Sequence, residues 1–325
     1  MPNDTDRSSN RRDFLAATAA ATATGLALPS LAQESTEEEP LFKISLAQWS
    51  LHRTLSMDPS NEGKDNLRFP EIAKKQCGID AVEYVNAFFK EKAKDKAYLK
   101  ELKARTDDLG VKNVLIMVDG EGALGDADQQ KRQQAIDNHK QWVEAAKYLG
   151  CHSIRVNAQS SGTPEEQSRQ AADGLRRLSE WAKQHDINVI VENHGGLSSN
   201  GSWLAGVIKS VDLPNCGTLP DFGNFKLGQT VTEADGVKTV CERTYDRYRG
   251  VNELMPSAKA VSAKSHQFNQ DGNETGTDYF KMMKIVLDHG YHGYVGIEWE
   301  GEHPGEMEGI RLTKELLERV RSELA

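Results

Sequence analysis

This 325-residue sequence has little that is typical of a membrane-spanning protein or of a nucleic-acid-binding protein. After residue 40, no apolar stretch approaches the roughly 20 residues that a membrane-spanning helix needs. The formal net charge is −9, whereas nucleic-acid-binding proteins carry a basic surface. We therefore expect neither a membrane nor a nucleic acid as a partner.

Two kinds of motif are also missing. Cys77, Cys151, Cys216 and Cys241 are far apart and form no CxxC pair, so we expect small buried residues instead of a zinc site or a disulfide framework, although one oxidised pair stays open. The residues after Ala47 contain no GxGxxG and no GKS/T. This absence argues against a doubly wound nucleotide-binding sheet.

The N-terminus has the pattern of an export signal. Arg11 and Arg12 precede Phe14 and Leu15, an Ala/Thr-rich apolar run follows to Leu28, and Ser30-Leu31-Ala32 resembles a cleavage site. We interpret residues 1–32 as a twin-arginine signal peptide and residues 33–40 as an acidic leader. The mature protein would then be periplasmic or otherwise extracytoplasmic.

Residues 41–325 alternate short apolar runs with amphipathic helical stretches. Helices are predicted over 128–149, 164–185, 236–255, 278–289 and 307–324. Eight strands are predicted, over 42–47, 81–85, 113–118, 153–157, 188–192, 217–221, 260–266 and 294–298. Strands that alternate with helices predict a parallel sheet covered on both faces, and eight such units favour a single-domain (β/α)8 TIM barrel.

Active sites of such barrels lie at the C-terminal ends of the strands. There the sequence places Glu192, Asp221 and Glu298, at the ends of strands five, six and eight. In the seventh strand, period-two alternation puts Lys264 and His266 on one face. Three carboxylates and one imidazole suit one divalent ion, Mn²⁺, Mg²⁺, Co²⁺ or Zn²⁺, and we expect Glu192, Asp221, His266 and Glu298 to be its ligands.

The segments VIVENHGG, LPDFGNF and VGIEWEG resemble the xylose-isomerase-like barrel family, which includes ketose 3-epimerases and inosose dehydratases. The resemblance covers the whole mature chain and implies a small-molecule sugar or glycoside as substrate. Two positions depart from the family pattern. Ser262 stands where many members have a histidine two residues before the lysine, and we expect His266 to substitute for it. Asn224 stands where the epimerases have a histidine that contacts substrate.

The resemblance implies that Glu192 and Glu298 transfer protons beside a metal-bound carbonyl, as in an isomerase or epimerase of a free sugar or keto-sugar. His194, Arg155, Asn157, Asn224 and Lys264 are the candidate substrate contacts. Two alternatives stay open: a lyase that eliminates the leaving group of a 3-keto-glycoside, and a non-catalytic sugar-binding barrel. Endonucleases of the same superfamily use a histidine-rich zinc cluster on a basic surface, which an acidic chain does not match. The oligomeric state is open, and a homo-oligomer is compatible with the sequence.

Overall fold

The computed structural model describes residues 39–55, 65–234 and 237–325. The predicted signal peptide and most of the acidic leader lie outside these residues. From Pro40 onward the chain is one compact unit. None of its described helices is both long and apolar enough to cross a bilayer.

Within the described residues, eight parallel strands form the central sheet, in the order β6-β5-β4-β3-β2-β1-β10-β9. They are β1 (Lys43–Ala47), β2 (Ala81–Val85), β3 (Lys112–Met117), β4 (Ser153–Val156), β5 (Asn188–Glu192), β6 (Cys216–Leu219), β9 (Val261–Ser265) and β10 (Tyr294–Trp299). The two outer strands meet through isolated parallel bridges, Thr218 with Ala258 and Asp221 with Ser262. The sheet therefore closes on itself, which confirms the predicted TIM barrel, and the strand bounds agree with the prediction to within two residues.

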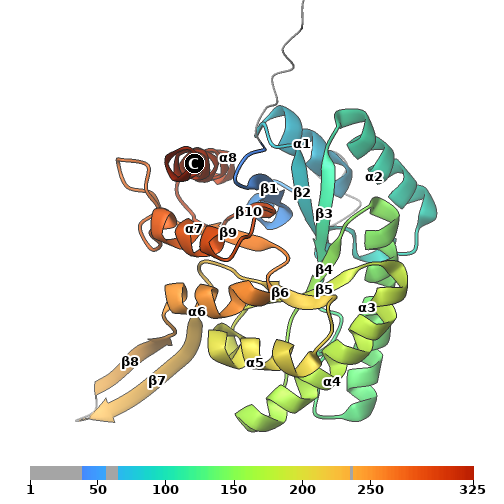
Figure 1. Cartoon of the computed structure of the whole chain (residues 1–325), viewed down its shortest axis with the longest axis vertical. Helices are drawn as coiled ribbons and strands as arrows, with labels where there is room; N and C mark the ends of the chain where they lie inside the picture. Colours follow the sequence, from blue (N-terminus) through green and yellow to red (C-terminus); the bar gives the residue numbers. More distant parts are fainter. Residues whose placement is uncertain (1–38, 56–64, 235–236) are drawn as a thin grey trace, which may run out of the picture. The chain divides into compact units, whose positions relative to one another are not determined.

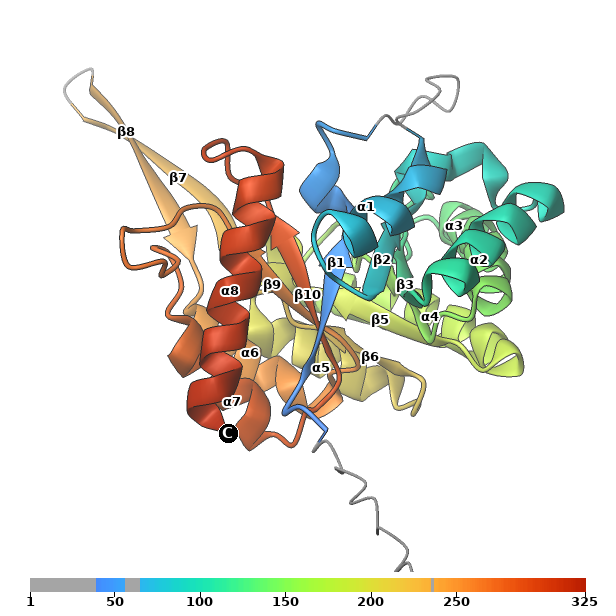
Figure 2. The same ribbon diagram turned by 90° about the horizontal axis from the view of Figure 1, so that it is seen from above.

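Helices surround the strands (Figures 1 and 2). The described α-helices are α1 (Phe69–Lys75), α2 (Lys96–Leu109), α3 (Gln129–Leu149), α4 (Pro164–Ala182), α5 (Gly201–Val211), α6 (Arg247–Leu254), α7 (Tyr279–Asp288) and α8 (Glu306–Leu324). Their termini follow local capping rules. Thr163 and Glu166 form a reciprocal capping box at the start of α4, and Gly150 takes the left-handed conformation after α3.

One predicted helix is partly wrong. Residues 236–255 were expected to be helical throughout, but β8 (Val237–Thr244) pairs antiparallel with β7 (Lys226–Ala234), and only Arg247–Leu254 forms an α-helix. The hairpin extends away from the barrel in both views (Figures 1 and 2). Asp235-Gly236 between two β-branched segments is a hairpin signal in the sequence, and it predicts this pairing better than the helical reading does.

Candidate metal and proton-transfer site

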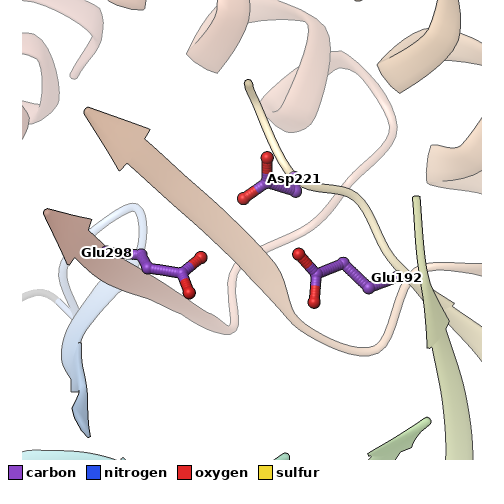
Figure 3. A group of neighbouring side chains, drawn as sticks. All are labelled: Glu192, Asp221 and Glu298. Carbon is purple, nitrogen blue, oxygen red and sulfur yellow. The ribbon is translucent and has the colours of Figure 1, made fainter. Parts of the chain in front are cut away.

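Three carboxylates converge at one end of the barrel. Glu192 ends β5, Asp221 follows β6 by two residues, and Glu298 lies near the end of β10. Each offers an oxygen within 4.8 Å of the others, and all three side chains are buried. Figure 3 shows the three carboxyl groups pointing toward a common space. The structure thus brings together three of the four residues predicted from the sequence as metal ligands.

Strand β9 contributes two polar side chains to the same space. The Ser262 hydroxyl oxygen lies 2.6 Å from Oδ2 of Asp221 and 3.0 Å from Oε2 of Glu298. The Lys264 ammonium lies 3.4 Å from Glu298 and 3.9 Å from Asp221, and it also contacts Glu300 at 3.1 Å. Because β9 bridges to Asp221 where the barrel closes, Ser262 is fixed beside that carboxylate.

His266 does not join the three carboxylates. Strand β9 ends at Ser265, so the alternation that would keep His266 on the face of Ser262 and Lys264 stops one residue earlier. Its side chain is 52% exposed, and its Nε2 faces Glu300 at 3.6 Å. In this structure, therefore, His266 supplies no fourth ligand to the carboxylate group.

Arg155 holds Glu192 from the side of β4. Its Nε lies 2.9 Å from Oε2 of Glu192, an ion pair without hydrogen-bond geometry, and both side chains are buried. Its Nη1 donates to Asp119 at 2.7 Å, and Asn157 donates to the same carboxylate oxygen at 2.6 Å. Asp119 was not among the residues predicted for the site, although it follows the apolar strand β3 by two residues, as Asp221 follows β6.

Amide groups fix the other oxygens. Asn224 donates through its side chain to Oε1 of Glu192 at 2.8 Å. The backbone N–H groups of Gly223 and Asn224 both donate to Oδ1 of Asp221 at 2.8 Å. Asn193 exchanges two hydrogen bonds with the backbone of Asp221, so it joins the loops after β5 and β6. Asn224 and Lys264, predicted as substrate contacts, here contact the carboxylates.

Burial sets the electrostatics of the site. It raises the pKa of Glu192 to about 7, against the opposing charge of Arg155. It also raises the pKa of Asp221 to about 7, against the opposing charge of Lys264. Burial disfavours the Lys264 ammonium, but the surrounding carboxylates outweigh it and raise the pKa of Lys264 well above its usual value. Lys264 is thus a fixed cation in the same space as Glu192 and Asp221, the two carboxyl groups whose pKa is raised to about 7.

A cavity of about 430 Å³ adjoins Glu298. Its polar wall includes three of the predicted substrate contacts, Arg155, Asn157 and His194. Burial and the nearby cations lower the pKa of His194, so its imidazole is neutral at pH 7. The remaining lining side chains are Trp49, Val85, Ala87, Val118, Asp119, Glu121, His139, Gln159 and Glu300. Such a mixture of polar groups with one indole suits a polyhydroxylated ligand.

The donor set fits a divalent cation. Three buried carboxylates lie close enough for each to supply one oxygen to a common ion. With all three ionised they carry three negative charges, and the cations Lys264 and Arg155 beside them are themselves shared with Glu300 and Asp119. The group as a whole therefore keeps a net negative charge, which a divalent ion would help to balance.

A family match described as "Xylose isomerase-like TIM barrel" covers residues 72–322, and the chain belongs to this family. Among solved structures it is similar to 3-keto-D-glucoside 4-epimerase from E. coli, with TM-score 0.62, 16% identity, and coverage of 86% of this chain and 99% of that one. It is also similar to the IOLI protein with a binding zinc atom, with TM-score 0.63, 15% identity, and coverage of 87% and 99%.

One curated relative matches over a shorter stretch. The C-glycoside deglycosidase alpha subunit of Arthrobacter globiformis is 34% identical over 65 residues. The match spans 19% of this chain and 18% of that relative.

Proposed function

We propose that the protein is a metal-dependent sugar isomerase or epimerase that moves a proton beside a carbonyl group. The observation that carries this proposal is the pair of buried carboxylates, Glu192 and Glu298, which reach one space from β5 and β10. Family membership and the epimerase among the similar structures support the reaction class. A free sugar or keto-sugar is the proposed substrate.

Glu192 is the first proton acceptor in this proposal. A catalytic base works best when its pKa is near the working pH, and burial raises the pKa of Glu192 to about 7. Arg155 and Asn224 hold its two oxygens, so the carboxylate has a fixed orientation. Glu298 acts from the opposite side of the space, where it returns a proton to the substrate carbon.

A bound divalent ion would act as a Lewis acid that stabilises negative charge on the carbonyl oxygen. Glu192, Asp221 and Glu298 would hold this ion. Lys264 adds a fixed positive charge next to the same space. Arg155, Asn157 and His194 line the cavity, and in this proposal they bind sugar hydroxyl groups, while Asn224 orients Glu192.

A lyase is the second candidate. The short match to a C-glycoside deglycosidase subunit favours a glycoside as substrate, and one of the similar structures is a 3-keto-D-glucoside 4-epimerase. Proton abstraction beside a ketone begins both reactions. In the lyase, the carbanion then expels the aglycone instead of taking a proton on the other face.

Product analysis separates these candidates. The protein, supplied with Mn²⁺, would be incubated with a panel of free ketoses and 3-keto-glycosides, and the products identified by NMR. An epimeric or isomeric sugar supports the proposal, and a released aglycone supports the lyase. A protein that binds sugars from the panel but converts none of them would be a non-catalytic sugar-binding barrel.

We also propose export by the twin-arginine route, on the strength of Arg11 and Arg12 ahead of the apolar run. Replacing both with lysine should leave the full-length protein in the cytoplasm, whereas the unchanged chain should be found outside it without residues 1–32. Equal export of the two chains, measured by cell fractionation, would contradict this assignment.

A further inference from the structure

A hydroxyl group, that of Ser262, lies beside the three carboxylates. Ser262 is 1% exposed, and its oxygen contacts both Asp221 and Glu298 at hydrogen-bond distance. Among the described residues, no histidine or cysteine joins the three carboxylates. Lys264 and Arg155 also lie beside the carboxylates, but as cations they have no lone pair for a metal ion. The metal ligands that this group offers are therefore oxygen atoms.

We propose that Glu192, Asp221, Glu298 and Ser262 form a cation site of oxygen donors alone. This site takes Mg²⁺ or Mn²⁺ as its working ion and lacks the Zn²⁺ preference that an imidazole gives. Carboxylate and hydroxyl oxygens suit hard ions such as Mg²⁺ and Mn²⁺, whereas nitrogen and sulfur ligands favour Zn²⁺. The inference rests on the proposed function, because it specifies the metal of the same site.

The position of Ser262 is fixed by the backbone. Where the barrel closes, its N–H donates to the carbonyl of Pro220 at 3.0 Å, and its own carbonyl accepts from Phe222 at 3.1 Å. These two bonds bracket Asp221 in the sequence. The hydroxyl is therefore placed before any ion binds, and binding requires no movement of β9.

His266, the nitrogen donor predicted from the sequence, lies elsewhere. It is half exposed, and its Nε2 faces Glu300 at 3.6 Å, which in turn contacts Lys264 at 3.1 Å. Its imidazole therefore supplies no nitrogen to the three carboxylates in this structure.

Titration calorimetry of the apo protein with Mg²⁺, Mn²⁺ and Zn²⁺ tests the preference. We expect the wild type to bind Mn²⁺ and to favour Zn²⁺ over Mn²⁺ by no more than about tenfold. Ser262→His should raise that Zn²⁺ preference by a further factor of about ten or more. Ser262→Ala should weaken Mn²⁺ binding by about tenfold, while Ser262→Thr keeps the hydroxyl and should bind Mn²⁺ better than Ser262→Ala.

Pulsed EPR of the Mn²⁺-loaded wild type gives a second readout, because it detects nitrogen atoms bound to the ion. We expect no coupling to an imidazole nitrogen in the wild type and a clear coupling in Ser262→His. A nitrogen coupling in the wild type that disappears in His266→Ala would overturn the proposal.

Two calorimetric results would also overturn it. A Zn²⁺ preference of a hundredfold or more in the wild type would refute the oxygen-only site but leave proton transfer by Glu192 and Glu298 intact. Failure of all three ions to bind would refute this site together with the metal dependence of the proposed function.

Discussion

Loss of the Arg155 side chain should lower the stability of the protein and raise the pKa of Glu192. Its side chain is 4% exposed and its partner Glu192 is 2% exposed, so Arg155→Met would leave a buried carboxylate without its cation. Removing one partner of a buried ion pair costs about 3–5 kcal/mol. Asp119 also loses Arg155 as its partner in this variant. Because Asp119 is 37% exposed, solvent screens its charge, and this second loss adds little to the cost.

Glu192 can lower this cost by taking up a proton, because its pKa is already about 7. We therefore expect the lower end of that range, about 3 kcal/mol at pH 8, which corresponds to a fall in Tm of about 6–12 °C. Arg155 lowers the pKa of Glu192, so this pKa should rise further in the variant. Its destabilisation should be larger at pH 8, where Glu192 must be charged in the wild type, than at pH 6.

Thermal unfolding followed by circular dichroism at pH 6 and pH 8, in the presence of a chelator, would measure this effect. Arg311→Met is the matched control, because Arg311 also pairs with two carboxylates, Glu308 and Glu315, but lies on the surface. The Tm of the control should be close to that of the wild type at both pH values. Two results would contradict this prediction: Arg155→Met is no less stable than the control, or it loses the same stability, relative to the wild type, at pH 6 and at pH 8. Either result would show that Arg155 does not stabilise the charged form of Glu192.

Two further predictions concern buried acids and the ion. Burial raises the pKa of Glu83 to about 8, so the stability that its protonated form contributes is complete below about 4.5 and declines as pH rises through 8. The variant Glu83→Gln cannot ionise at this position. Between pH 6 and pH 8, in the presence of a chelator, the free energy of unfolding of the wild type should therefore fall by roughly 2 kcal/mol more than that of the variant. An equal fall in both proteins would show that Glu83 is already charged at pH 6. Saturating Mn²⁺ at 100 times its Kd should stabilise the wild type by about 2.7 kcal/mol. Asp221→Asn should lose most of this gain, and an equal gain in the variant would place the ion elsewhere.

The barrel and its acidic residues were accessible from the sequence because both depend on local patterns. Glu192 and Glu298 each follow an apolar run at or near the end of a strand, and parallel strands bring such ends together whatever the helices between them do. The order and direction of the strands are therefore enough to predict that Glu192, Asp221 and Glu298 cluster. This prediction needs no knowledge of side-chain packing.

His266, Asp119 and the β7–β8 hairpin show where this reasoning stops. The face on which His266 lies depends on where β9 ends, and strand ends are not encoded by alternation. Asp119 ends a strand like the other acids, but its role is set by the Arg155 side chain, which reaches it from the neighbouring strand. Residues 237–244 pair with the neighbouring residues 226–234, so this strand pairing outweighed the helical pattern predicted over 236–255.

The central claim is that Glu192 and Glu298 transfer protons at the same substrate carbon. Deuterium incorporation from heavy water into that carbon, followed by NMR on a substrate that the protein converts, tests it most directly. We expect the Mn²⁺-loaded wild type to incorporate deuterium, and Glu192→Gln and Glu298→Gln each to do so about 10²–10⁴-fold more slowly while still folded. A Glu298→Gln variant that retains full turnover and full exchange would contradict the account.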